Sequence, residues 1–187
     1  MSQPSAGVLA GPMAAMRVVE AADLVLEPQT AAHADEMFAV LGDPAIYEFE
    51  NEPPPSLEWL RTRYAKLESR RSADGREQWL NWVIRLPSGE LAGYVQATVF
   101  QTAEAMIAYE LNSRHWGRGV ASSAVALMLE ELTSRYGVRT FSAVLKRTNT
   151  RSLRLLERFG FAHASEAEYR KRSIPGDELL MLRPATP

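Results

Sequence analysis

The part of the sequence best suited to chemistry is a glycine turn flanked by arginines, Arg114-His115-Trp116-Gly117-Arg118-Gly119-Val120-Ala121-Ser122. It lies between a stretch that alternates like a strand and a stretch with helical periodicity. Two glycines two residues apart allow a tight turn that a ligand can approach closely. The amides and dipole of a helix start attract anions, and the two arginines add positive charge. The pattern predicts a phosphate or pyrophosphate site; a plain turn with two solvated arginines is the alternative.

Two other phosphate-binding motifs fit this turn less well. The spacing half-matches the dinucleotide fingerprint, with Ser122 in place of the third glycine. However, the preceding strand belongs to an antiparallel meander, and the following strand ends at Leu145-Lys146-Arg147 without an acidic ribose ligand. A P-loop is excluded because the turn has no Gly-Lys-Ser/Thr.

Composition limits the chemistry further. The 187 residues contain no cysteine, which excludes disulfides, thiolate metal sites and cysteine nucleophiles, and no metal is expected. The net charge of −2 argues against direct nucleic-acid binding as the main activity. No apolar run is long enough to span a membrane. Residues 1–16 lack the basic start and uninterrupted apolar core of a signal peptide, so we expect a flexible tail and a cytoplasmic location.

The elements that must position the turn follow from periodicity, which predicts the order β-α-α-β-β-β-α-β-α-β-β. Strands are expected at 23–28 (with an extended piece at 17–19 before it), 79–86, 91–100, 105–111, 138–145, 162–170 and 178–183. Helices are expected at 30–42, 56–67, 120–136 and 149–160. The fold class is α/β (α+β), a mixed and mostly antiparallel sheet of six to seven strands flanked by about four helices. Residues 17–187 form its single domain.

The chain as a whole resembles the GNAT acyltransferases, and within them the RimJ/RimL-like branch of ribosomal-protein N-terminal acetyltransferases. Four stretches carry this resemblance: residues 23–26 with the helix up to Gly42-Asp43-Pro44; 89–94; the Arg114-x-x-Gly117-x-Gly119-x-Ala121 signature; and Asn149-x-x-Ser152 followed by 155–161. Their order and spacing cover about residues 23–184. The resemblance implies the GNAT fold and an acyl-CoA-dependent activity.

The resemblance also implies roles for individual residues. The amides from His115 to Ala121 would bind the CoA pyrophosphate, and the backbone around Tyr109 to Leu111 would pair with pantetheine. Asn149 would bind the pantetheine or thioester region, and Ser152 would protonate the leaving thiolate; helix capping is the alternative for both. The expected acetyl-CoA site comprises Tyr109, Leu111, Arg114, His115, Trp116, Gly117, Arg118, Gly119, Val120, Ala121, Ser122, Asn149 and Ser152.

Attack on a thioester needs a neutral amine and therefore a base or a wet proton path. Glu110 is the first choice, with Glu104 and His115 as alternatives; we expect His115 to face solvent. Because side chains alternate along a strand, Glu110 and Tyr109 should face opposite sides unless a bulge intervenes.

The segment from Asp43 to Glu58 corresponds to a wall of the acceptor site in the family. Here Tyr47, Glu48 and Glu50 are candidates for binding a cationic amine, with a solvated loop as the alternative. Arg147, Arg151, Arg154 and Arg158 form a basic face that is expected to be solvated, although Arg147 or Arg151 could reach the CoA 3′-phosphate.

The sequence therefore predicts an N-acetyltransferase that transfers acetyl directly from acetyl-CoA to a primary amine, in a ternary complex. The acceptor would be a protein N-terminus or a small-molecule amine, and the enzyme a monomer or homodimer. A GNAT-fold module that binds acyl-CoA as a sensor, without turnover, is the alternative.

Overall fold

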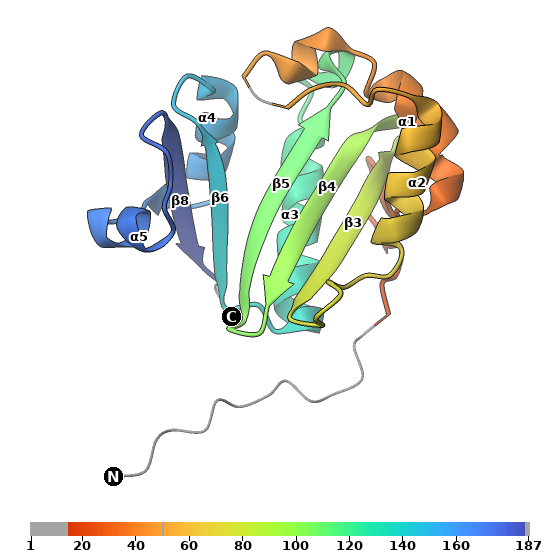
Figure 1. Ribbon diagram of the computed structural model, residues 1–187. Coiled ribbons are helices and arrows are strands. Elements are labelled where there is room, and N and C mark those ends of the chain that lie inside the picture. The colour runs from red at the N-terminus through yellow and green to blue at the C-terminus, as the bar shows by residue number, and fades with distance from the viewer. Residues whose placement is uncertain (1–14, 50, 186–187) are drawn as a thin grey trace.

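The computed structural model describes residues 15–49 and 51–185. The predicted tail, 1–16, falls outside these residues except for its last two, of which Met16 packs against the core. Within the described residues, eight strands form one sheet in the order β1-β2-β3-β4-β5-β6-β8-β7 (Figure 1). The strands are β1 (Val19–Glu20), β2 (Val25–Pro28), β3 (Glu77–Arg85), β4 (Leu91–Phe100), β5 (Glu104–Leu111), β6 (Thr140–Lys146), β7 (Ala162–His163) and β8 (Glu178–Pro184).

Five α-helices accompany the sheet in the described part of the chain: α1 (Ala34–Val40), α2 (Leu57–Leu67), α3 (Val120–Tyr136), α4 (Thr150–Arg158) and α5 (Glu166–Lys171). In Figure 1, α3 crosses behind the sheet, and α1 and α2 lie beside β3. The α/β fold class predicted from periodicity is confirmed. Within the described ranges, no helix is both long enough and apolar enough to cross a bilayer.

Strand alternation divides the buried side chains between the two faces of the sheet. On one face, Trp82 and Ile107 belong to the cluster that α3 covers through Met128 and Leu132. On the other face, α1 and α2 pack over a smaller cluster that includes Val83 and Leu91 of the sheet. Because each helix buries only one apolar stripe, the two clusters hold the sheet between them.

The pairing of β5 with β6 is the one parallel contact among the described strands, and it is short. Glu104, Ala105 and Met106 pair with Thr140, Phe141 and Ser142, and no pairing continues beyond them. The two strands then diverge (Figure 1), which leaves the upper part of β5 with a strand neighbour only on the β4 side. This separation creates the space in which the candidate site lies.

Gly93 of β4 fixes the end of β5 beside that space. Its φ is +156°, and a Cβ here would lie 2.1 Å from the Glu110 carbonyl oxygen. The register with β3 also shifts at this point, because Ile84 pairs with Gly93 while Arg85 pairs with Leu91. Only glycine allows the two backbones to approach so closely.

The predicted strand at 162–170 is confirmed only for its first two residues. Strand β7 has two residues, and α5 begins four residues after the strand's start. The Ser165 hydroxyl accepts a hydrogen bond from the Glu168 amide and caps this helix. Acidic residues in its first turn and basic residues in its last turn complement the helix dipole. This charge order was the signal available in the sequence.

Candidate active site

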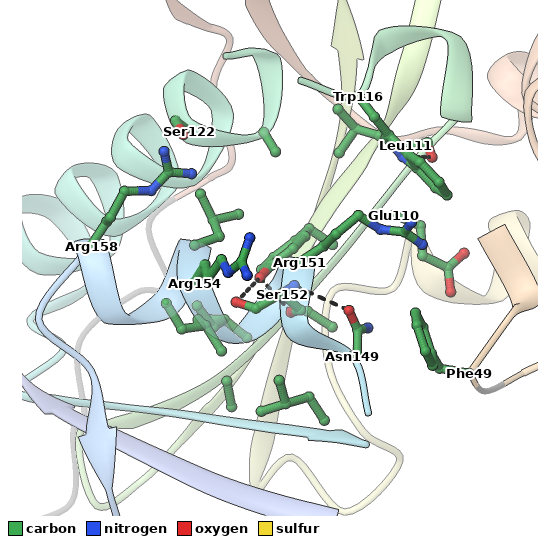
Figure 2. Close-up of a pocket in the computed structure, with 18 of the residues that line it drawn as sticks. Phe49, Glu110, Leu111, Trp116, Ser122, Asn149, Arg151, Ser152, Arg154 and Arg158 are labelled. Atoms are coloured by element: carbon green, nitrogen blue, oxygen red, sulfur yellow. Dashed lines mark hydrogen bonds between the residues drawn. The ribbon is translucent and has the colours of Figure 1, made fainter. Parts of the chain in front are cut away.

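A cavity of about 860 Å³ opens between the diverging strands β5 and β6. Its wall combines β5, the glycine turn, the first turn of α3, the middle of β6 and one face of α4. Figure 2 shows these side chains converging from different elements. The volume lies within the range of small-molecule and cofactor sites.

The glycine turn forms one end of the cavity, and the chemistry of this end suits an anion. Gly117 and Gly119 have φ values of +71° and +85°, and α3 begins directly afterwards. The first helical bond in this turn is donated by the Ser123 amide to the Gly119 carbonyl. The amides from Gly117 to Ser122 therefore have no backbone acceptor in the described structure, and they are available to an anion.

Two amides expected in this cradle are committed elsewhere. The His115 and Trp116 amides donate to the carbonyls of Asn112 and Ser113 in a short 3₁₀ turn, at 3.0 Å each. The available donors therefore begin at Gly117, two residues later than predicted. The His115 and Trp116 side chains nevertheless line the cavity.

The structure buries the His115 side chain and places Arg114 and Arg118 outside the lining of the cavity. Arg114 forms an ion pair with Glu90 at 3.1 Å, and neither this arginine nor Arg118 lines the cavity. The His115 side chain is buried rather than exposed to solvent. Its Nε2 accepts a hydrogen bond from Arg114, and burial, with help from Arg114 and Arg118, lowers the pKa of the imidazole.

The cations at this end of the cavity come instead from α4. Arg154 and Arg158 line the cavity, and in Figure 2 Arg158 extends from α4 towards the first turn of α3, near Ser122. The sequence alone predicts a solvated face for these two arginines. Arg147, by contrast, donates to the Gly176 carbonyl. The four-residue spacing of Arg154 and Arg158, which puts both on one side of the helix, was the available signal.

The other end of the cavity contains a pair of hydroxyls. The Tyr109 and Ser152 oxygens lie 2.6 Å apart, and burial raises the pKa of Tyr109 to about 12. Asn149 caps α4 because its Oδ1 accepts from the Ser152 amide at 3.1 Å. The capping alternative therefore applies to the Asn149 side chain, whereas the Ser152 hydroxyl takes no part in the cap.

Glu110 lies on the face of β5 opposite to Tyr109, as alternation predicts. It pairs across the sheet with Tyr94, whose hydroxyl hydrogen-bonds to the Glu110 carboxylate. The Asn51 amide donates to the same carboxylate at 3.0 Å. Both Tyr109 and Glu110 still line the cavity, because the missing neighbour beyond Met106 opens β5 from either face.

Glu104, the alternative base, lies at the closed end of the strand pair. Arg172 forms an ion pair with its carboxylate, and Ser142 donates to it at 2.9 Å. These contacts outweigh partial burial and lower the pKa of Glu104. It does not line the cavity, so the structure does not bring Glu104 to the site.

The expected acceptor wall closes the cavity on the side of α1. Arg151 of α4 reaches this wall, pairs with Glu48 at 2.7 Å and stacks 4.0 Å from the centre of the Trp116 ring. Arg151 is therefore held against the segment that contains Glu48. The Tyr47 hydroxyl donates to the Leu41 carbonyl. Glu50, the third predicted residue, lies outside the described residues.

The Asp43 carboxylate holds this wall against the end of β5. It accepts hydrogen bonds from the Ser113 amide at 2.6 Å and the Ala45 amide at 3.0 Å. These contacts lower the pKa of Asp43, the Ser113 bonds being the largest cause. Asn112 adds a bond to the Val40 carbonyl. In the described part of the chain, no cluster of three or more His, Cys, Asp or Glu side chains is arranged to hold a metal ion.

The comparison with known families agrees with this architecture. A family model described as an acetyltransferase (GNAT) domain matches residues 23–162. The chain belongs to the GNAT acetyltransferase family. It is therefore an acyl-CoA-dependent enzyme that transfers an acetyl group to amines, and the family resemblance inferred from the sequence is confirmed.

Solved structures of other GNAT proteins share the fold. RimL, described as a ribosomal L7/L12 alpha-N-protein acetyltransferase in complex with coenzyme A, has a TM-score of 0.75 and 18% identity over 90% of this chain and 98% of its own. Ribosomal-protein-S5-alanine acetyltransferase from Vibrio fischeri has a TM-score of 0.73 and 16% identity, over 91% of this chain and 97% of its own. A GNAT acetyltransferase from Bacillus anthracis has a TM-score of 0.71 and 18% identity, over 90% of this chain and 99% of its own. No protein with a curated function matches the sequence significantly.

Proposed function

We propose that this GNAT enzyme acetylates a primary amine, a protein N-terminus or a small-molecule amine, by direct transfer from acetyl-CoA in a ternary complex. The observation that carries the proposal is the placement of Tyr109 with Ser152 on one face of β5 and of Glu110 on the other, both at one cavity. A group bound between the strands would then meet a proton donor on one side and a carboxylate on the other.

The cavity fits the elongated shape and charge of acetyl-CoA. The unpaired amides from Gly117 to Ser122 and the guanidinium groups of Arg154 and Arg158 would bind its phosphates. The open side of β5 between Ile107 and Leu111 would accompany the pantetheine arm. The Asn149 side-chain nitrogen, left over from the cap, would be a donor near the thioester.

We assign the proton transfers to the two faces of β5. Glu110 would accept the proton from the incoming amine, so that the nitrogen lone pair can form the new C–N bond. As the C–S bond breaks, the Ser152 hydroxyl would donate a proton to the sulfur, and the Tyr109 hydroxyl would replace that proton. Since the chain has no cysteine, no thiol-linked acyl-enzyme is available, and the acetyl group passes directly to the amine.

The structural similarity to RimL supports the protein N-terminus as the first acceptor to test. RimL is an alpha-N-protein acetyltransferase of ribosomal L7/L12, the Vibrio fischeri enzyme is a ribosomal-protein-S5-alanine acetyltransferase, and both share this fold over nine-tenths of the chain. A cytoplasmic location and a monomeric or homodimeric state remain predictions of the same proposal.

A thiol-release assay with acetyl-CoA against N-terminal peptides and small amines tests the proposal. We expect turnover with at least one primary amine, and a rise in Tm when acetyl-CoA is added. A Tm shift without turnover on any amine would favour the sensor. The absence of both the Tm shift and turnover would refute the proposal.

A further inference from the structure

Helices α1 and α2 cover only part of the sheet face on which they pack. The rest of that face has no covering helix in the described structure. We call it the open sheet face and define it by Trp59, Arg63 and Lys66 of α2, Trp79 and Asn81 of β3, Gln96 and Thr98 of β4, and Met106 and Ala108 of β5. In Figure 1, α1 and α2 lie beside β3, and no helix lies in front of β4 and β5 to their left. Trp59 and Met106 are 44% and 43% exposed, two of the three large hydrophobic side chains so exposed in the described structure.

The open sheet face is continuous with the acceptor side of the active site. Alternation along β5 puts Met106, Ala108 and Glu110 on one face of the sheet. The register with β4 pairs Glu110 with Tyr94, Ala108 with Gln96 and Met106 with Thr98. Moving from Glu110 to Met106 covers four residues, about 13 Å at the rise of an extended chain.

The chemistry of this face suits an extended acidic peptide. A cavity of about 270 Å³ between α2 and the sheet is lined by Arg63 and Lys66, and no acidic side chain lines it. Neither cation forms an ion pair with any described residue, although Arg63 stacks 5.4 Å from the Trp59 ring centre. The side chains of Asn81, Gln96 and Thr98, which line the same cavity, make no hydrogen bond within the described structure. Gln96 and Thr98 are partly exposed and can bind peptide groups, whereas Asn81 is only 4% exposed and lies at the floor of the cavity.

From this arrangement we infer that the acceptor is a polypeptide whose N-terminal amine lies at Glu110, whose next residues run down the open sheet face, and whose acidic side chain meets Arg63 and Lys66. The inference rests on the proposed function and narrows it to one acceptor class. At about 3.3 Å per residue, the third to fifth residues of an extended chain would reach the level of Ala108 to Met106. Those positions are where the acidic residue is required.

The test uses peptides that share their first two residues and carry Asp, Asn or Lys at positions three to five. Thiol release with acetyl-CoA gives kcat/KM for each. We expect the acidic peptide to be preferred over the basic one by roughly three- to tenfold, the scale of one or two exposed ion pairs, with less preference at high salt.

Arg63→Glu and Lys66→Glu should each remove or reverse this preference, through KM rather than kcat. Arg61→Glu is the matched control, because Arg61 lies on the same helix but pairs with Asp35, and its reversal changes the net charge equally. It should retain the wild-type preference. The Tm shift with acetyl-CoA should be the same in all three variants, which shows that they fold and bind the cosubstrate.

Four results would overturn the inference. The first is equal kcat/KM for the acidic and basic peptides. The second is that Arg61→Glu changes the peptide preference as much as Lys66→Glu does. The third is acetylation of small amines but not of peptides. The fourth is a wild-type dimer that Met106→Glu dissociates, since a second copy would then cover the face. Absence of turnover with every amine, by contrast, would count against the proposed function itself.

Discussion

The hydroxyl of Tyr109 lies 2.6 Å from the hydroxyl of Ser152, although one residue belongs to a strand and the other to a helix that faces it across the cavity. Burial holds the pKa of Tyr109 at about 12, so the phenol stays protonated at neutral pH. It can therefore donate to Ser152 while Ser152 donates onward. Neither contact involves the cap of α4, which uses the Ser152 backbone amide.

Ser152→Ala should lower kcat about 10- to 100-fold and change the affinity for acetyl-CoA little, because it removes a proton donor but keeps the cap. Tyr109→Phe keeps the Ser152 hydroxyl and should therefore lower kcat by a smaller factor. Thiol-release kinetics and the Tm shift with acetyl-CoA measure the two effects. Asn149→Ala is the structural comparison: loss of the cap should cost about 1 kcal/mol and lower Tm by roughly 2–4 °C. An unchanged kcat in Ser152→Ala would exclude Ser152 from proton transfer.

Local patterns in the sequence predicted the elements well, because local signals specify them. Gly119 and Gly137 bound α3 with positive φ at either end, and the periodicity between them is helical. The alternation that separates Tyr109 from Glu110 is equally local. That both still reach one cavity depends on where the pairing of β5 with β6 stops, which is a tertiary property.

Side-chain direction was the part that the sequence could not determine. The sequence pattern of a basic helix predicts that its arginines are exposed to solvent. Only the packing of α4 beside the cavity directs Arg154 and Arg158 towards it. His115 is buried because the 3₁₀ turn before Gly117 rotates it away from solvent, a geometry that no spacing rule predicts.

Glu110→Gln should lower kcat/KM by about 100-fold or more, since the amide keeps the shape of the carboxylate but accepts no proton. Tyr94→Phe removes one hydrogen-bond donor to this carboxylate and should lower kcat by roughly three- to tenfold. Tyr64→Phe is the matched control, because the Tyr64 hydroxyl is buried without a hydrogen-bond partner in the described structure. It should leave turnover unchanged. Glu110→Gln with wild-type turnover would mean that solvent takes the proton.

Gly119→Glu should abolish the Tm shift produced by acetyl-CoA, because it places a side chain and a negative charge among the amides that would bind phosphate. Gly89→Glu is the control for backbone strain: its φ of +88° is close to the +85° of Gly119, a Cβ at either position meets open space, and Gly89 does not line the cavity. Both variants should lose about 1–2 kcal/mol of stability in the absence of ligand. Only Gly119→Glu should fail to respond to acetyl-CoA. Equal responses would place the phosphate site elsewhere.

The buried His115 should make the protein less stable as the pH falls below about 6.5. Burial, with help from Arg114, lowers the folded-state pKa of His115, so the unfolded chain binds a proton that the folded protein does not. The free energy of unfolding begins to fall near pH 6.5, about the pKa of histidine in the unfolded chain. It stops falling once the pH is below the pKa of His115 in the folded protein. His115→Gln, which keeps an acceptor for Arg114, should flatten the dependence of Tm on pH between 7 and 5. Glu90→Gln removes a carboxylate that raises the His115 pKa, so it should extend the loss to lower pH. Thermal denaturation from pH 8 to 5 measures all three proteins; superimposable curves for wild type and His115→Gln would show that His115 is protonated alike in both states.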